Sequence, residues 1–142
     1  MPTAYGFTAH GGPEVEAFLD LPRPVPGPGQ LLVAVRAAGV NPDDWKRRSG
    51  RRPPGVPAPE LPAVLGGEVA GIVEDVGEGT EGFAPGDAVF GNPVTGGYAE
   101  YTLLPAALAT HTAVFPLEQA AEALRVVEDG HARGKIVIEI GQ

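Results

Sequence analysis

The stretch LGGEVAGIVEDVGEGTEGFAPGDAVFGNPVTGGYAEY, residues 65–101, decides the fold of this chain. Extended segments joined by glycine turns are expected there and just beyond, over residues 68–76, 88–90 and 98–104. The first segment is rich in Val and Ile, which suit a pleated, half-buried surface. The pairs Gly66-Gly67 and Gly96-Gly97 stand where the backbone must bend tightly or another group must approach closely. The stretch therefore predicts the centre of a small β-barrel.

The glycines at residues 77–82 form a literal G-x-G-x-x-G after a predicted strand. A dinucleotide site also needs a helix that opens at these glycines, so that backbone N–H groups and the helix dipole meet the pyrophosphate. Pro85 and Gly86 follow instead and prevent a helix. Glu78 and Glu81 would also repel a phosphate. The sequence favours a plain β-turn over a nucleotide loop.

Composition narrows the class of protein. A chain of 142 residues with 21 Gly and 16 Pro between apolar runs is typical of one domain with many short strands. The net charge of -8 argues against a nucleic-acid partner, because that function needs a basic face. Zero Cys excludes disulfides and thiolate metal sites. No membrane-spanning run or signal peptide is recognised, so we expect a cytoplasmic protein without a membrane partner.

The N-terminal part adds further strands, which we expect over residues 3–9, 15–21 and 30–38. Residues 30–38 give the clearest strand pattern of the chain. Asn41-Pro42 opens a single helical turn over residues 43–48, because Asn caps a helix well and Pro suits its first position. The proline-rich residues 22–29 and 51–62 are predicted loops.

The C-terminal part changes character. Residues 117–129 carry apolar side chains at the spacing of one helix face, at Leu117, Ala120, Ala121, Leu124 and Val127. Pro116 and Gly130 supply start and stop signals, and residues 135–140 alternate as a final strand. No βαβ alternation is recognised. The expected fold is mainly β or α+β: a barrel with a short helical turn, one C-terminal helix and a returning strand.

Five motifs now carry a resemblance. GVNPDDWKRRSG, LGGEVAGIVEDVG, GDAVFG and GGYAEY resemble, in that order, the zinc-free quinone-oxidoreductase branch of the medium-chain dehydrogenase/reductase superfamily. FPLEQAAEALRVVEDGHARGKIVIEI resembles the extreme C-terminus of the same proteins. Members have a GroES-like catalytic domain made from the two ends of the chain. Between those ends they insert a Rossmann domain that binds NADPH.

The resemblance implies a single GroES-like catalytic domain over residues 1–142. Its N-terminal section would be residues 1–109 and its C-terminal helix and strand residues 117–142. Residues 110–116 would be a bridge at the point where the Rossmann domain is absent. The sequence is thus expected to be the catalytic domain without its nucleotide domain, whether through engineering or through natural loss.

The same resemblance bears on metal binding. Zinc-dependent relatives carry Cys where Asn41 stands and His where Gly67 stands, so that Glu68 alone remains of their ligands. One carboxylate is no zinc site, because tetrahedral zinc takes three or four side-chain ligands. The three histidines fall in unrelated segments, at His10, His111 and His131. We expect no metal.

Asn41 matches a family Asn that lies near the nicotinamide and the substrate. Its amide can donate and accept hydrogen bonds, which suits orienting a carboxamide or a quinone oxygen. Capping the helical turn is its alternative role, and the two are compatible. The resemblance assigns Asn41 and Asp44 as catalytic residues and Asn41 and Lys46 as cofactor-binding residues.

The substrate pocket is expected at Trp45, Arg52 and Gly67. Arg52 stands where enoyl-reducing relatives carry a Tyr, so that a tyrosine proton donor is absent and enoyl reduction is in doubt. Lys46 stands where several quinone reductases have Tyr. The basic run of residues 46–52 is either a solvated loop or a cationic patch that attracts a nucleotide phosphate. Tyr98 and Tyr101 are expected to pack in strands.

Two functions remain open. In the first, the chain is the catalytic domain of an NADPH-dependent quinone oxidoreductase-like protein, with a quinone or enone as substrate. Such a domain would bind no cofactor alone and show little or no activity, because the protein supplies binding and orientation while the hydride comes from NADPH. In the second, it is a non-enzymatic binding or scaffold module. In either case the face left by the missing domain is expected to drive homo-oligomer formation.

Overall fold

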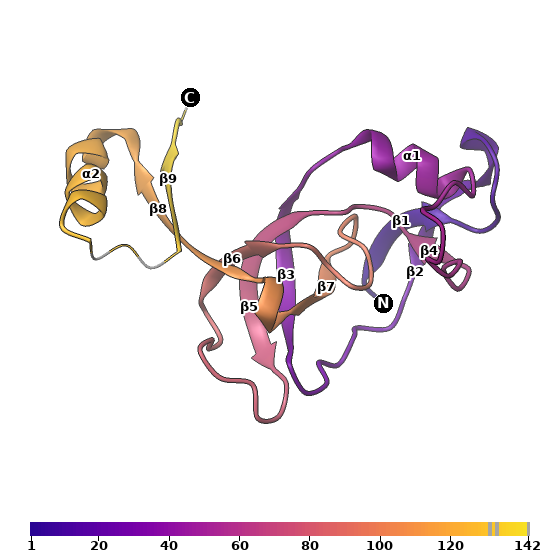
Figure 1. The fold of residues 1–142 in the computed structure, drawn as a ribbon, viewed down its shortest axis with the longest axis horizontal. Coiled ribbons are helices and arrows are strands. Elements are labelled where there is room, and N and C mark those ends of the chain that lie inside the picture. Colours follow the sequence, from indigo (N-terminus) through magenta and orange to yellow (C-terminus); the bar gives the residue numbers. More distant parts are fainter. Residues whose placement is uncertain (131, 133, 142) are drawn as a thin grey trace.

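The computed structural model describes residues 1–130, 132 and 134–141. Its larger sheet has six strands in the order β7-β3-β5-β6-β8-β9 (Figure 1). They are β3 (Gln30–Ala38), β5 (Val69–Val76), β6 (Ala88–Gly91), β7 (Tyr101–Pro105), β8 (Thr110–Pro116) and β9 (Lys135–Glu139). The three pairings among β7, β3, β5 and β6 are antiparallel. These four strands form the middle of the molecule.

A second, three-stranded sheet has the order β2-β1-β4. It contains β1 (Thr3–Phe7), β2 (Glu16–Asp20) and β4 (Ala63–Val64), and a 3-10 turn, η1 (Pro13–Val15), precedes β2. A single bridge between Ala4 and Ala99 joins β1 to the segment before β7. In the described part of the chain the two sheets do not close on each other. The expected barrel is therefore an open, two-sheet arrangement, while the α+β class is confirmed.

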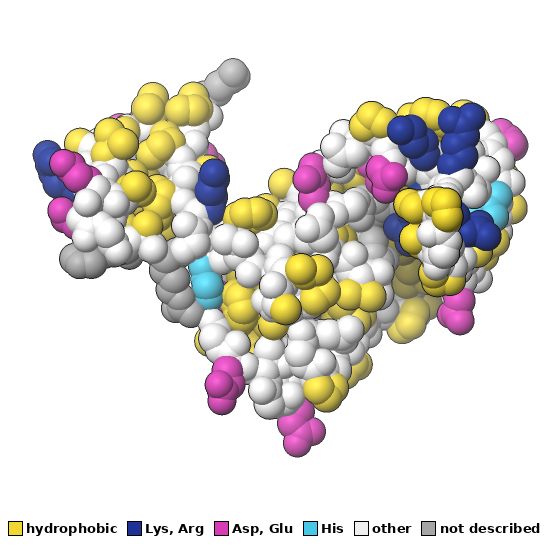
Figure 2. Space-filling model, in the orientation of Figure 1, with side chains coloured by type: hydrophobic (Ala, Val, Ile, Leu, Met, Phe, Trp, Pro, Cys, Tyr) yellow, Lys and Arg dark blue, Asp and Glu magenta, His cyan; other side chains and the backbone are white. Residues whose placement is uncertain are grey.

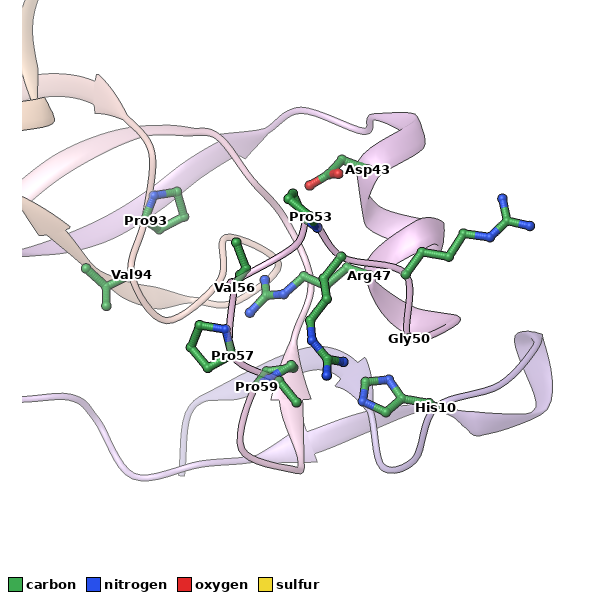
Figure 3. Close-up of a pocket in the computed structure, with 13 residues that line it drawn as sticks. His10, Asp43, Arg47, Gly50, Pro53, Val56, Pro57, Pro59, Pro93 and Val94 are labelled. Atoms are coloured by element: carbon green, nitrogen blue, oxygen red, sulfur yellow. The ribbon is translucent and has the colours of Figure 1, made fainter.

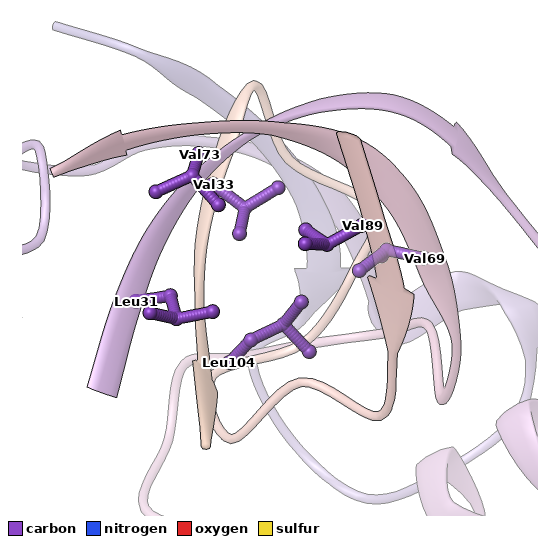
Figure 4. Close-up of a cluster of buried hydrophobic side chains, with 6 residues drawn as sticks. All are labelled: Leu31, Val33, Val69, Val73, Val89 and Leu104. Carbon is purple, nitrogen blue, oxygen red and sulfur yellow. The ribbon is translucent and has the colours of Figure 1, made fainter. Parts of the chain in front are cut away.

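The core lies inside the larger sheet. Six fully or almost fully buried side chains pack together from β3, β5, β6 and β7 (Figure 4): Leu31, Val33, Val69, Val73, Val89 and Leu104. A second cluster joins Phe7 of β1, Ala63 of β4 and the adjacent Leu65, with Tyr98 packed against it. Burial of these Val and Leu side chains drives folding, at about 25 cal/mol for each Å² of apolar surface removed from water.

The structure confirms some of the predicted strands and shifts the bounds of others. The prediction for residues 30–38 is confirmed, because β3 runs from Gln30 to Ala38. The strand expected from residue 98 begins at Tyr101 instead. The reason is that the backbone N–H groups of Gly97 and Tyr98 both donate to the carbonyl oxygen of Leu65, at 2.8 Å. This turn keeps Tyr98 out of the ladder.

The helical turn after Asn41 is confirmed as α1 (Pro42–Arg48), with Pro42 at its first position. Two acidic residues lie in its first turn and three basic residues in its last, which complements the helix dipole. The loop of residues 51–62 follows and returns the chain to β4. No helix among the described residues has the length and apolar character needed to cross a membrane.

The C-terminal residues form a lobe that projects from the sheet (Figure 1). After β8, a 3-10 turn η3 (Leu117–Gln119) leads into α2 (Ala120–Glu128), and β9 then pairs parallel with β8. Strand, helix and parallel strand make a βαβ unit, so the expectation of no βαβ alternation was wrong. The βαβ unit was missed because residues 110–116 were interpreted as a bridge, although Thr, Val and Phe there favour a strand.

The lobe buries little of its apolar surface. Ala123 is the buried residue of α2, whereas Leu124 is 70% exposed. The predicted apolar face is therefore rotated relative to the face that the sheet covers. Only two residue pairs connect the lobe to β6 in the ladder, Val89 with His111 and Phe90 with Thr110. Hydrophobic side chains are visible on the lobe's surface in Figure 2.

Candidate active site

The Asp44 carboxylate holds α1 against the rest of the body. Its Oδ2 accepts hydrogen bonds from the backbone N–H of Asn41, at 2.8 Å, and from the Tyr98 hydroxyl, at 2.9 Å. Its Oδ1 accepts from the backbone N–H of Gly66, at 3.0 Å. Gly66 has a φ of 98°, a left-handed conformation that favours glycine. These three bonds make Asp44 a positioning residue; a catalytic role for it stays a prediction.

Tyr98 supports the same arrangement. Its hydroxyl donates to Asp44 and also lies 3.2 Å from the carbonyl oxygen of Gly39. Burial, followed by the hydrogen bond to Asp44 and the charge of that carboxylate, raises the pKa of Tyr98 to about 12. The phenol therefore keeps its proton at neutral pH and shares it with Asp44.

A second carboxylate fixes the Asn41 side chain. Asn41 Nδ2 donates to Glu68 Oε1 at 3.0 Å. A Cβ at Gly39 would collide with the Glu68 carboxylate, so the glycine leaves the room that this side chain occupies. We call Asn41, Gly67, Glu68 and Asn92 the polar edge, because Asn92 Nδ2 donates to the Gly67 carbonyl oxygen at 2.8 Å. The edge is exposed to solvent.

The polar edge does not fit zinc. The Glu68 carboxylate accepts from an amide, and no three His, Cys, Asp or Glu side chains gather at a metal-binding distance among the described residues. The ring of His10 lies beside Phe7, at 5.6 Å between centroids. The ring of His111 stacks on Phe83, at 4.3 Å, and its Nε2 lies 2.9 Å from the Gly82 carbonyl oxygen. His131 lies outside the described residues.

Beside the polar edge, α1 and the proline-rich loop enclose a cleft of about 440 Å³. Figure 3 shows Arg47 and His10 around the same hollow as Val56, Pro57 and Pro59. Arg51 and Arg52 line it as well. We call it the arginine cleft.

The structure divides the predicted site residues among three places. Asn41 and Gly67 belong to the polar edge, which Asp44 supports. Arg52 lines the arginine cleft. Trp45 and Lys46 lie on the exposed surface of α1, where the Arg51 guanidinium is 5.3 Å and Lys46 Nζ 5.9 Å from the Trp45 ring centre.

Sequence reasoning missed some neighbours of these residues. Asn92 was not singled out, although Asn92-Pro93 follows a strand just as Asn41-Pro42 does. The partner of Glu68 was also missed, since a contact between residues 41 and 68 leaves no local pattern.

The far end of α1 is anchored too. Arg48 forms an ion pair with Glu16, whose Oε2 accepts from the Tyr5 hydroxyl at 2.8 Å. The Tyr5 hydrogen bond, followed by Arg48, lowers the pKa of Glu16. The two polar anchors, Asp44 and Arg48, hold α1 against the body and thereby position the two cleft-lining residues of α1, Asp43 and Arg47.

Comparison with known proteins places this geometry in a family. The alcohol dehydrogenase GroES-like domain model matches residues 27–114, and the zinc-binding dehydrogenase model matches residues 106–138. The quinone oxidoreductase of Lama guanicoe is 46% identical over 95 residues, which cover 66% of this chain and 28% of the relative. Quinone oxidoreductase 1 of Escherichia coli is 36% identical over 123 residues, which cover 85% of this chain and 36% of the relative.

Solved structures agree. The Escherichia coli quinone oxidoreductase complexed with NADPH matches with a TM-score of 0.70 and 35% identity, over 78% of this chain and 33% of that one. The chain spans about a third of the length of the curated relatives that it matches. It therefore belongs to the alcohol dehydrogenase GroES-like family, within the quinone-oxidoreductase branch of the medium-chain dehydrogenases/reductases.

Proposed function

We propose that this chain forms the substrate-side domain for NADPH-dependent reduction of a quinone or an enone. Its relatives bear the name quinone oxidoreductase, and two of the matching structures are complexes with NADPH. The observation that carries the proposal is the fixed orientation of the Asn41 side chain at an exposed edge. NADPH, when bound, supplies the hydride.

Asn41 orients the reacting groups. Its Nδ2 is committed to Glu68, which sets the plane of the amide. Asn41 also takes part in the capping box of α1, so its amide is held in place from two sides. Because Asn41 is exposed, its amide can still hold a nicotinamide carboxamide or a quinone oxygen that reaches this edge. Lys46, on the same short helix, contributes a positive charge for the nucleotide. Holding both reactants in one geometry is how such a site accelerates a transfer.

The proton balance fits a quinone better than an enone. Tyr98 is a poor general acid, because its pKa is about 12 and its proton is already donated to Asp44. The polar edge is open to water, and a hydroquinone oxygen takes its proton from water readily. Reduction of an enone carbon profits more from a positioned acid.

The domain boundaries follow from the same proposal. Residues 1–109 and 117–142 would form one catalytic domain, and residues 110–116 would stand where relatives insert their nucleotide domain. The two family matches overlap over residues 106–114, which supports a junction there. Since the chain covers about a third of its relatives, we infer little or no activity for it alone, in a cytoplasmic setting.

Calorimetric titration with NADPH, repeated with NADH, tests this inference directly. We expect no saturable heat up to millimolar nucleotide, and NADPH oxidation with 1,4-benzoquinone at the rate of buffer. Saturable binding in the micromolar range would overturn the inference of an inactive domain.

The role of Asn41 needs a nucleotide domain. We would insert the domain of the Escherichia coli relative between residues 109 and 117 and measure quinone-dependent NADPH oxidation. Asn41→Ala should lower kcat/KM at least about tenfold, the effect of losing a positioning hydrogen bond in the transition state. Gln119→Ala removes an exposed amide from η3 and should change nothing. An Asn41→Ala rate equal to the parent's would refute the proposed role.

A second candidate function is self-association as a binding module. Its support is the exposed apolar surface of the lobe, which carries Val114, Leu117, Leu124, Val127, Val137 and Ile140. Large apolar side chains exposed together on one small lobe are typical of an interaction site. We commit to a second copy of this chain as the occupant, through the same lobe surface on both copies.

Light scattering at tens of micromolar tests the self-association. We expect at least a dimer mass for the wild type and a shift to monomer for Leu124→Lys. Val25→Lys is the matched control, because Val25 is 82% exposed on the loop before β3, away from the lobe. A monomeric wild type would remove this candidate.

A further inference from the structure

The arginine cleft concentrates positive charge on an acidic chain. Five of the ten Lys and Arg residues fall within residues 46–52, although the net charge is -8. Three of these five, Arg47, Arg51 and Arg52, line the cleft. Figure 2 shows Lys and Arg side chains gathered over α1. The charge is therefore placed at one site rather than spread over the surface.

The cleft arginines lack carboxylate partners. Arg48 faces Glu16, but no described carboxylate lies within 4.0 Å of the charged groups of Arg47, Arg51 or Arg52. Arg47 Nη1 lies 3.4 Å from a backbone carbonyl oxygen, and Arg51 stacks on Trp45. Asp43 lines the same cleft and is its one carboxylate among the described lining residues. The cleft keeps a net positive charge even with His10 neutral.

The walls of the cleft set the shape of a ligand. Val56, Pro57, Pro59, Pro93 and Val94 present apolar carbon, while the guanidinium groups present planar donors. Proline fixes its own backbone φ, which limits the conformations that these walls can adopt before a ligand arrives. A volume of about 440 Å³ suits a molecule of one or two rings. Apolar walls with guanidinium donors fit an unsaturated ring compound that ends in an anion.

We propose that the arginine cleft binds the carboxylate arm of the substrate, so that the acceptor is a quinone or enone bearing an acidic group. The guanidinium groups would hold that carboxylate through charge-assisted, bidentate hydrogen bonds. The identity of the reacting part rests on the proposed function, whereas binding of the acid by the cleft does not depend on it.

The test uses the 142-residue chain and a matched ligand pair. trans-Cinnamate and trans-cinnamamide have the same shape and differ in charge, and both are titrated by ¹H–¹⁵N NMR. Cinnamate should shift the signals of Gly50 and Val56 and the Nε–H signals of the cleft arginines. Cinnamamide should bind at least about fivefold more weakly, the worth of one exposed charge-assisted hydrogen bond. Raising the salt concentration from about 50 to about 500 mM should reduce the difference in affinity between cinnamate and cinnamamide, because salt screens the charge interaction.

Arginine variants assign the effect to the cleft. Arg52→Gln and Arg47→Gln should each weaken cinnamate binding at least about threefold. Arg125→Gln makes the same change on the exposed surface of α2 and should leave the affinity unchanged. The dispersion of the NMR spectrum shows that each variant is folded. Equal affinity for acid and amide, or an equal effect of Arg52→Gln and Arg125→Gln, would overturn the proposal.

Inorganic phosphate and NADPH are titrated in parallel. If phosphate shifts the same signals and binds tighter than cinnamate, the cleft is a phosphate site and the carboxylate assignment is wrong. If cinnamate binds while NADPH does not, the acid site stands independently of a nucleotide site. If Asn41→Ala then leaves the kcat/KM of the insertion chimera unchanged, the proposed reaction is refuted, whereas the proposed acid site is not.

Discussion

The body, residues 1–109, and the C-terminal lobe after it both combine strands with a helix, yet they bury very different amounts of apolar surface. All but one of the buried apolar side chains of the described residues lie between Ala4 and Leu104, and the exception is Ala123. Both regions have a strand ladder and a helix. The difference is that β3 has strand neighbours on both sides and a packed inner face, whereas the apolar side chains of α2 remain half uncovered.

This contrast teaches that a ladder of backbone hydrogen bonds does not by itself make a stable region. The stability of the body comes from apolar burial and from the two polar anchors of α1. The lobe relies on its parallel strand pair and on the short ladder with β6. A region with few buried apolar contacts opens locally at low free energy.

The largest effect should come from the core of the body. Leu104→Ala removes a side chain with no exposed surface and should lower the free energy of unfolding by about 2–5 kcal/mol. Urea denaturation followed by far-UV circular dichroism measures this. Leu108→Ala is the control, because Leu108 is 58% exposed and should cost less than about 0.5 kcal/mol. Similar losses in the two variants would contradict the placement of the core.

The polar anchor of α1 should give the next effect. Asp44→Ala leaves the N–H groups of Asn41 and Gly66 without their acceptor and the Tyr98 hydroxyl with the Gly39 carbonyl oxygen alone, and should cost about 2 kcal/mol. Its neighbour Asp43 is exposed, so Asp43→Ala is the matched control, with little change expected. The same urea titration separates the two. If Asp43→Ala proves as costly, the helix dipole and not the anchor would be responsible.

Alkaline pH should weaken the body through Tyr98. The folded state keeps the Tyr98 proton up to a pKa of about 12, while the unfolded state releases it near 10.0. The stabilisation is therefore complete below pH 10 and is lost as the pH rises toward 12. Tyr98→Phe should show a shallower loss of melting temperature over this range. Parallel curves for the two proteins would mean that Tyr98 does not carry the effect.

The smallest effect should come from the lobe. Leu124→Ala trims a side chain that is already 70% exposed, so the free energy of unfolding should change by less than about 0.5 kcal/mol at low protein concentration. Repeating the measurement at tens of micromolar sharpens the result, because a dimer through this surface would make the cost depend on concentration. A cost above about 2 kcal/mol at low concentration would show that the lobe is packed as tightly as the body.

The sequence predicted the elements of the body well for a physical reason. Residues 30–38 combine β-branched and apolar side chains with turn signals at both ends, and the structure has β3 at the same bounds. Asn41-Pro42 likewise marked α1 through cap and first-turn chemistry. Such signals depend only on residues that are neighbours in the sequence, so they can be interpreted without knowing the fold. The open arrangement of the two sheets depends instead on long-range pairing, which no local pattern records.

The lobe and the site show where such reasoning ends. The apolar spacing of residues 117–129 predicted a helix correctly, but spacing alone could not say that Ala123 rather than Leu124 would be covered. Resemblance directed attention to Asn41, Gly67 and Glu68, while the hydrogen bond between Asn41 and Glu68 and the one from Asn92 to Gly67 emerged only from contacts across the fold. The sequence shows the basic run of residues 46–52 directly. It does not show that Pro93 and Val94, which are distant in sequence, line the same cleft.

The distribution of aromatic residues has a consequence for spectroscopy. The single Trp and all three Tyr residues, at Trp45, Tyr5, Tyr98 and Tyr101, belong to the body, and residues 110–142 contain neither type. Trp and Tyr fluorescence and the Trp and Tyr bands of near-ultraviolet dichroism therefore report on the body alone, and the lobe adds only the weak Phe band of Phe115. A lobe that melts on its own would escape both probes and appear only in far-ultraviolet dichroism, as a transition that precedes the quenching of Trp45.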